Sequence, residues 1–139
     1  MSSIQSYFAP LSSDLYTDKN QWETTQIGRS IDVHTEGFFP DLNLAEIAIF
    51  NVPEYEGSKN SASEGACKIK ALFYSFHHEK LPAIVDLGCL KLMSTRKESF
   101  KIIEEVCEHL LTNGVIPFVL GGGNDLSYAI YRAYSSLGK

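Results

Sequence analysis

Three short apolar runs, each followed by a segment with helical spacing, constrain the fold of this chain more than any other feature. The runs are EIAIFNVP at 46–53, PAIVDLGCL at 82–90 and VIPFVL at 115–120. None of them alternates apolar and polar residues, which is typical of strands that are covered on both faces. Because the segments between them are long enough for right-handed crossovers, the order predicts a three-layer α/β/α fold with a parallel sheet.

The strongest helical signal spans 95–113. Thr95 and Glu98 form a capping box at its start, and Asn113-Gly114 supplies a left-handed stop at its end. One face of this segment carries the apolar residues Phe100, Ile103, Cys107, Leu110 and Leu111. The pattern predicts an amphipathic helix that packs this face against the sheet.

Two further helices are predicted from weaker patterns, one before the second apolar run and one at 126–134. The first has an apolar stripe that we expect to face the core: Ile69, Leu72 or Phe73, and Phe76. Residues 46–139 are therefore expected to form one parallel βαβαβα unit. In residues 1–45 aromatic residues are interleaved with Ser, Thr, Asp and Pro, and neither the helical nor the strand period persists. We therefore expect an irregular segment there that is not itself the core, although its aromatic residues could anchor it to a core: Tyr7, Phe8, Trp22, Phe38 and Phe39.

Composition excludes several classes of partner. The chain has 139 residues, a net charge of −5 and 44% hydrophobic residues, which suits one globular domain. An acidic chain with mixed charges does not attract nucleic acid or an anionic membrane. No apolar run reaches membrane-spanning length, no secretory signal is present, and the three cysteines form no C-x-x-C pair. We therefore expect a cytoplasmic protein with reduced thiols and no nucleic-acid or membrane partner.

The third apolar run ends in a glycine-rich turn, GGGNDL, before the last helical segment. In parallel sheets ligands lie beyond the carboxyl ends of the strands, so Gly121, Gly122 and Gly123 form a candidate binding turn. The turn completes neither a P-loop nor a dinucleotide fingerprint, and Asp125 would repel a phosphate. Two interpretations stay open: a tight turn in which Asn124 or Asp125 caps the next helix, or a binding site.

Several segments resemble, in order, the ureohydrolase superfamily, which includes arginase, agmatinase and formimidoylglutamase. PFVLGGGND, with the preceding IIEEVCEHLLTNGVI, is similar to the strand and glycine turn that carry the first manganese-binding histidine of that family. SEGACKIKALFYSF and IVDLG resemble its first helix and second strand. The resemblance covers about 46–134, with formimidoylglutamase-like members as the nearest group. It implies an arginase-like fold, two manganese ions, and hydrolysis of a guanidine or amidine C–N bond by a hydroxide that bridges the ions.

Two departures limit what the resemblance implies for this chain. Asn124 stands where the family has its histidine ligand, and a neutral amide oxygen binds manganese more weakly than imidazole. Asp125 is the other candidate ligand, although capping is the more ordinary use of such a residue. The D-x-H-x-D and D-x-D-x-x-D motifs that supply the other ligands of the family do not occur in the sequence. We therefore expect these residues alone to bind no manganese, and we assign no catalytic residue.

Other polar residues receive structural interpretations. The four histidines are given no ligand role: His34, His77, His78 and His109. The adjacent pair is expected to close a helix at the negative end of its dipole. Cys89 is expected to be a core thiol, and Asp86 to hydrogen-bond loop backbone near the carboxyl edge of the sheet, with a role in a site left open.

The sequence therefore predicts the amino-terminal part of a ureohydrolase-type protein, inactive by itself, whose partner is the remaining part of the same protein. Two alternatives stay open. One is a degenerate, metal-deficient family member that acts as a binding or scaffold protein; the other is an unrelated small α/β module for a nucleotide or anion. A sheet that lacks the remaining part of the protein exposes the edge of a strand and apolar surface. We therefore expect self-association by edge pairing or by burial of a helix face.

Overall fold

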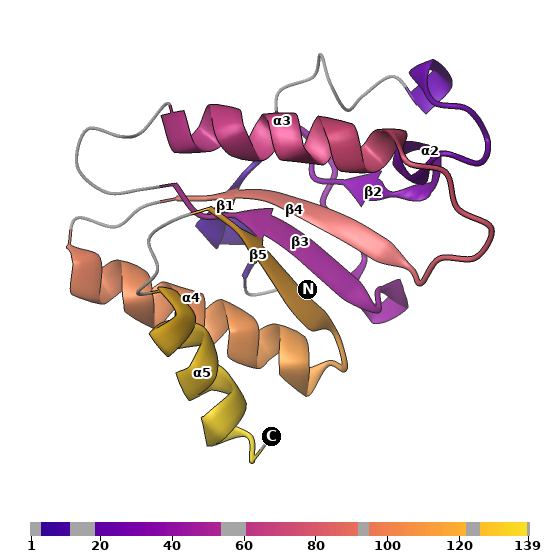
Figure 1. Cartoon of the computed structure of the whole chain (residues 1–139). Coiled ribbons are helices and arrows are strands. Elements are labelled where there is room, and N and C mark those ends of the chain that lie inside the picture. The colour runs from indigo at the N-terminus through magenta and orange to yellow at the C-terminus, as the bar shows by residue number, and fades with distance from the viewer. Residues whose placement is uncertain (1–3, 12–18, 54–60, 92–94, 122–125, 139) are drawn as a thin grey trace.

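The computed structural model describes residues 4–11, 19–53, 61–91, 95–121 and 126–138 (Figure 1). The longer strands are β3 (Ile47–Asn51), β4 (Ile84–Leu90) and β5 (Ile116–Leu120). The longer helices are α3 (Ser61–Ser75), α4 (Arg96–Thr112) and α5 (Leu126–Ser136). The short elements all precede β3: η1 (Gln5–Tyr7), β1 (Phe8–Ala9), η2 (Lys19–Gln21), α2 (Ile27–Ser30), β2 (Asp32–Val33) and η3 (Leu42–Leu44).

The sheet has the order β1-β4-β3-β5, and β2 also pairs with β4. β3 pairs in parallel with both β4 and β5, as the crossovers predicted. β2, a strand that the sequence did not indicate, is also parallel to β4. β1 is antiparallel to β4, which the sequence did not indicate. The predicted three-layer α/β/α fold is confirmed, with a mixed and mostly parallel sheet.

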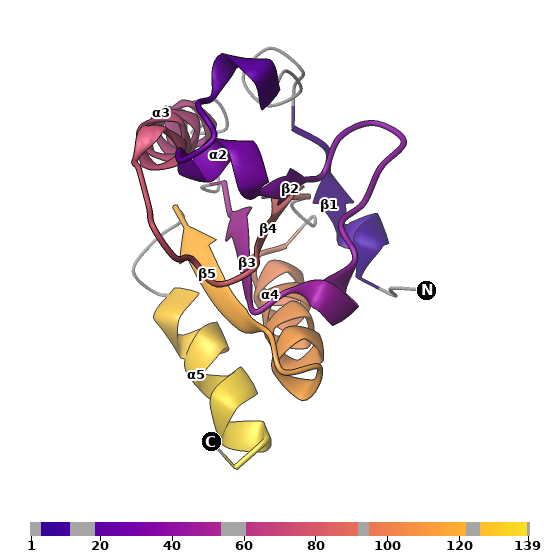
Figure 2. The same cartoon turned by 90° about the vertical axis from the view of Figure 1, so that its right-hand side faces the viewer.

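Helices cover both faces of the sheet. α2 and α3 lie on one face, and α4 and α5 lie on the other (Figures 1 and 2). A large apolar core between the sheet and α4 and α5 includes Phe50, Leu87 and Ile103, while a smaller one under α2 and α3 includes Ile31, Ile49 and Tyr74. No helix in the described part of the chain is long and apolar enough to cross a bilayer.

The capping signals of α4 are confirmed. The side chain of Thr95 accepts a hydrogen bond from the Glu98 backbone N–H at 3.1 Å. The helix ends at Thr112, and Gly114 adopts the left-handed conformation with φ of 76°. The predicted apolar face is buried along the sheet, except that Phe100 is only half-buried.

The inner face predicted for α3 is largely wrong. Ile69, Leu72 and Phe76 are 50–62% exposed, and of the predicted stripe only Phe73 is half-buried against the smaller core. Among the α3 side chains that the structure describes, the buried ones are Lys70 and Tyr74. The reason lies in the sheet below, where the carboxylate of Asp86 on β4 binds both of these side chains. An ion pair with a hydrogen-bonded hydroxyl thus replaces the apolar contact that the stripe predicted.

The third strand was predicted to be covered on both faces, and this too is wrong. β5 lies at the edge of the sheet, and Ile116 and Phe118 are more than half exposed. An edge strand has a neighbour on one side only, and α3 leaves the adjoining face of β5 open. An uninterrupted apolar run therefore did not imply burial in this case.

The described residues among the first 45 wrap around the β4 side of the sheet (Figure 2). Phe8 and Leu42 belong to the large core, and Ile27, Ile31 and Val33 belong to the small one. The helices and strands of this segment are short, as expected where neither the helical nor the strand period persists. Phe8 anchors the segment to the large core, as its aromatic residues suggested, whereas the buried aliphatic residues were not predicted.

Candidate functional site

The carboxyl ends of the three parallel strands meet at one edge of the sheet. Asn51 on β3 is in register with Cys89 on β4 and with Leu120 on β5. The Val52 N–H donates to the carbonyl oxygen of Leu120 at 2.9 Å, so the strands remain paired up to the start of the loops. In parallel α/β sheets this edge is where ligands bind, and we treat it as the candidate site.

The glycine turn begins at this edge. Gly121 has a φ of 87°, and a Cβ atom at this position would lie 2.8 Å from the Val52 carbonyl oxygen. Only glycine adopts this conformation without strain and fits this approach. The other members of the predicted binding turn and metal site lie outside the described residues, so their roles stay predictions: Gly122, Gly123, Asn124 and Asp125.

Asn51 is a polar residue of this edge that the sequence analysis missed. Its side chain is 2% exposed, and its Oδ1 atom has no hydrogen-bond partner. A buried amide oxygen without a partner costs free energy, so this atom is suited to accept a hydrogen bond or bind a cation at the edge. The available signal was a polar residue that closes an apolar strand directly before the loop.

Asp86 lies one strand away, and its carboxylate is fully engaged. Oδ1 contacts the ammonium of Lys70 at 2.7 Å and accepts from the Gly88 N–H at 3.0 Å. Oδ2 accepts from the hydroxyl of Tyr74. The bond to Gly88 is a contact with backbone, but with backbone of β4 and not of a loop as predicted, and the bonds to α3 were not predicted. With both oxygens occupied and both partners on α3 buried, Asp86 connects α3 to β4 and is not available as a metal ligand.

The histidines lie apart from this edge or are engaged by other groups. His34 is buried, and its Nδ1 atom lies 2.8 Å from the carbonyl oxygen of Leu87. α3 ends at Ser75, so His77 and His78 follow the helix and do not close it, which corrects their predicted position. His77 Nδ1 is hydrogen-bonded to the hydroxyl of Thr25 at 2.7 Å.

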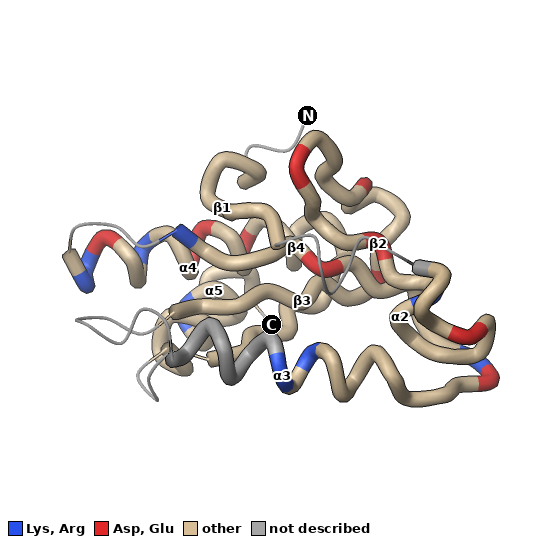
Figure 3. The backbone as a smooth tube through the Cα atoms, turned by 90° about the horizontal axis from the view of Figure 1, so that it is seen from above, with Lys and Arg blue, Asp and Glu red and all other residues tan. Residues whose placement is uncertain are grey.

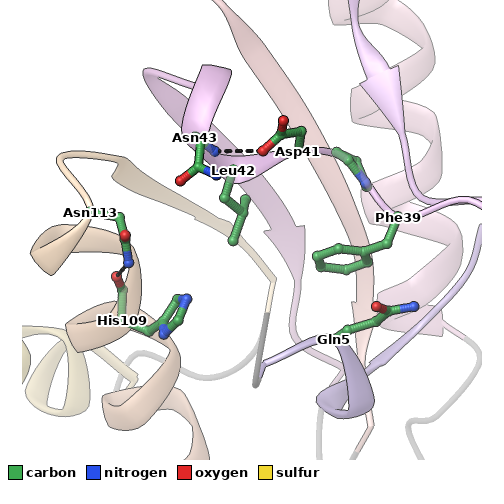
Figure 4. Close-up of a pocket in the computed structure, with 8 residues that line it drawn as sticks. Gln5, Phe39, Asp41, Leu42, Asn43, His109 and Asn113 are labelled. Atoms are coloured by element: carbon green, nitrogen blue, oxygen red, sulfur yellow. Dashed lines mark hydrogen bonds between the residues drawn. The ribbon is translucent and has the colours of Figure 1, made fainter. Parts of the chain in front are cut away.

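His109 lines a pocket of about 320 Å³ at the opposite end of the sheet (Figure 4). The pocket lies between the end of α4 and the segment before β3, and its wall includes Phe39, Leu42 and Asn113. In Figure 4 the imidazole ring and the phenyl ring of Phe39 face the cavity from opposite sides. Because these residues precede the amino ends of β3 and β5, the pocket lies far from the edge at which ligands of such folds bind.

The cysteines offer no activated nucleophile in the described part of the chain. Burial raises the pKa of the Cys107 thiol to about 12, and the nearby Glu108 adds to the rise. Cys89 is half-buried at the carboxyl edge, and its thiol lies 3.8 Å from the carbonyl oxygen of Leu90. A nucleophilic cysteine needs a lowered pKa, whereas the pKa of Cys107 is raised.

We expect Cys107 to resist a thiol-alkylating reagent in the folded protein, because only the thiolate reacts and burial suppresses it. The measurement is alkylation at mildly alkaline pH, followed by mass spectrometry of peptides, with and without denaturant. The half-buried Cys89 provides an internal comparison and reacts first. Equal labelling of both thiols in the native protein would contradict the burial of Cys107.

The described residues do not form a metal site. Among them, no three His, Cys, Asp or Glu side chains lie close enough to hold an ion together. Among the described residues of the carboxyl edge, the Asn51 amide oxygen is a buried atom without a partner, but it is neutral and therefore a weak ligand. A site for two manganese ions needs several anionic ligands, and this donor set does not supply them.

Comparison with known proteins identifies the family of this chain. The family model described as the arginase family matches residues 45–139. The formiminoglutamase of Trypanosoma cruzi, crystallised with Mn²⁺, is 26% identical with a TM-score of 0.55; the match covers 70% of this chain and 42% of that one. An arginase superfamily protein from the same organism is 26% identical with a TM-score of 0.51, and covers 67% of this chain and 40% of its own.

A third solved structure supports the fold alone. The agmatine ureohydrolase of Thermoplasma volcanium is 17% identical with a TM-score of 0.56, over 83% of this chain and 40% of that one. No curated protein gives a significant match to the sequence. The chain spans about two fifths of the length of the solved structures that it matches. Since the family model covers more than half of the residues and the fold agrees, this chain belongs to the arginase family.

Proposed function

We propose that this chain forms the amino-terminal part of a metal-dependent hydrolase that cleaves the C–N bond of a guanidine or amidine. The family match over residues 45–139 supports this proposal. The T. cruzi relative supports the assignment of manganese and of a formimidoylglutamate-like or arginine-like substrate to the whole protein.

The carboxyl edge of the sheet is the part of the site that these residues contribute. In our proposal the edge lines one side of the active site. It does so with strands that stay paired up to Asn51 and Leu120, and with a glycine turn that starts at Gly121. Side chains outside these 139 residues would hold the metal ions. The observation that carries this view is the match of the arginase-family model to residues 45–139, which include this edge.

A second candidate function rests on Asn124. This residue replaces the histidine that the resemblance places there, which favours a degenerate family member that binds a partner and lacks metal chemistry. The third alternative, an unrelated nucleotide- or anion-binding module, is wrong because the chain belongs to the arginase family.

We expect the isolated 139-residue chain to show no turnover. The experiment adds Mn²⁺ and measures urea or formamide release from arginine, agmatine and formimidoylglutamate, with an active arginase as the positive control. Release that depends on both the chain and Mn²⁺ would contradict the proposal that these residues need further ligands.

Metal binding separates the two candidate functions at the level of this chain. A protein that binds Mn²⁺ in the folded state gains thermal stability by mass action. We compare the melting temperature of the wild type with that of Asn124→His, which restores the family ligand, in the presence of Mn²⁺ and of Mg²⁺. A Mn²⁺-specific rise in the histidine variant alone favours an edge that still has the geometry of a metal site. No rise in either protein agrees with both candidate functions, because the first also places the other metal ligands outside these 139 residues, so only a rise separates them.

A further inference from the structure

The pocket at the amino end of the sheet takes no part in the proposed active site. It has a volume of about 320 Å³ and lies between the last turn of α4 and the segment before β3. Six of the side chains that line it are Gln5, Phe39, Asp41, Leu42, His109 and Asn113 (Figure 4). The first four precede residue 45, at which the match to the arginase-family model begins. Membership of the family therefore does not account for this pocket.

The walls of the pocket are held in place by contacts of their own. The ring of Phe39 packs edge-on against the ring of His34, with the centroids 4.9 Å apart. The carboxylate of Asp41 accepts from the Asn43 N–H at 3.0 Å at the start of η3. The side-chain amide of Asn113 donates to a carbonyl oxygen of the last turn of α4 at 2.8 Å. A site whose side chains are already ordered loses less conformational entropy when a ligand binds.

The three segments that form the pocket carry acidic residues and no basic ones. Residues 4–11, 31–50 and 102–113 contain no Lys or Arg (Figure 3). Their seven acidic residues are Asp32, Glu36, Asp41, Glu46, Glu104, Glu105 and Glu108. The carbonyl end of α4, which closes at Thr112, adds the partial negative charge of a helix C-terminus. The electrostatic potential at the pocket therefore favours a cation.

The pocket also suits an apolar group. In Figure 4 the rings of Phe39 and His109 face the cavity from opposite sides, and Leu42 adds an aliphatic wall. The face of an aromatic ring attracts cations as well as apolar groups. A volume of about 320 Å³ lies at the lower end of the range for ligand pockets, so the occupant is a small molecule.

We propose that this pocket binds a small organic cation, in which an amidinium, guanidinium or ammonium group is attached to a short apolar body. The cap of η3 uses Oδ1 of Asp41, so the cationic group pairs with Oδ2. The apolar body lies against Phe39 and Leu42. The inference does not depend on the proposed enzymatic function, because no residue of the carboxyl edge takes part.

The test is a titration of the isotope-labelled 139-residue chain with benzamidine, followed by NMR of the backbone N–H groups. At about pH 8, where free imidazole is neutral, the histidines of the pocket do not compete with the ligand for the carboxylate. We expect saturable shifts at Asn43, Asn113 and their neighbours, with a dissociation constant of about 1 mM, ordinary for a ligand of this size. Benzamide has nearly the same shape but no charge, and we expect it to bind at least ~10-fold more weakly.

Two variants locate the charge that the ligand recognises. Asp41→Asn removes the carboxylate but keeps an oxygen that caps η3, and we expect it to weaken benzamidine binding by ~10-fold. Glu23→Gln is the matched control. Its side chain, 75% exposed, lies between η2 and α2 on the other face of the sheet from α4, and its loss leaves the affinity unchanged.

Each outcome decides the proposal. The absence of saturable shifts up to about 20 mM benzamidine overturns it, as does equal affinity for benzamide and benzamidine. Unchanged affinity in Asp41→Asn also overturns it, because the cation would then bind elsewhere. An equal loss in Glu23→Gln does the same, since the attraction would come from net charge alone. The comparison of the two ligands uses the wild type only, so it decides the proposal even if a variant fails to fold.

Discussion

Replacing Asp86 by alanine lowers the free energy of unfolding by about 3–5 kcal/mol, because it leaves the ammonium of Lys70 buried without its partner. Lys70 and Asp86 are both 0% exposed at the side chain, and their charged atoms lie 2.7 Å apart. The substitution also removes the acceptor of the Tyr74 hydroxyl and of the Gly88 N–H. A loss of this size approaches the whole stability of a small domain. The measurement is urea unfolding followed by the fluorescence of Trp22, whose ring lies 6.4 Å from that of Tyr74.

The double variant Lys70→Met with Asp86→Asn is the control for this effect. It removes both charges, keeps the volume, and retains an amide oxygen for the Gly88 N–H and an amide N–H for the Tyr74 oxygen. Buried ion pairs that are replaced as a pair cost little, so we expect its stability to lie within about 1–2 kcal/mol of the wild type. If the double variant were as unstable as Asp86→Ala, the cost would come from shape and not from the unpaired charge.

The same ion pair explains where sequence reasoning about the fold succeeded and failed. The strands and α4 were predictable, because uninterrupted apolar runs and a capping box reflect local physics. The orientation of α3 was not, because the spacing rule assumes that apolar residues face the sheet. The contradicting signal was present: Asp86 interrupts an apolar strand, and a buried carboxylate requires a partner. The four-residue spacing of Lys70 and Tyr74 places both on one helical face, where they provide it.

The amino-terminal segment shows a different limit. β1 and β2 have two residues each, too few for any periodicity to be visible. Their positions depend on distant contacts, such as the bond from the His34 N–H to the Asp86 carbonyl at 2.7 Å. Of the candidate site, the carboxyl edge and the need for glycine at Gly121 were predictable from strand order and turn chemistry. Asn51 was not recognised, because a polar residue at a strand end is common and its unpaired oxygen is visible only in three dimensions.

Gly88 on β4 is the second position with a large expected effect. Its φ is 95°, and a Cβ atom there would lie 2.3 Å from the carbonyl oxygen of Ala9 on β1. Gly88→Ala therefore combines backbone strain with a collision against backbone, which cannot rotate away as a side chain can. We expect a loss of about 3–4 kcal/mol, the sum of a strained conformation and an overpacked contact. Urea unfolding measures this loss.

Gly114→Ala is the control that measures the backbone strain without the collision. Gly114 also has a positive φ, 76°, but a Cβ atom there would meet nothing within 4 Å. We expect this variant to lose about 1 kcal/mol, the cost of placing alanine in the left-handed region. The difference in stability loss between the two variants then measures how tightly β1 is held against β4.

We also expect faster proteolysis of residues 4–11 in the Gly88 variant. The shifted Ala9 weakens the bond from the Lys91 N–H to the Tyr7 carbonyl, which is 2.8 Å in the wild type. Equal losses in the two variants would show that β1 yields to the added methyl group at no cost, and that the amino-terminal segment is only loosely bound to the carboxyl edge of the sheet.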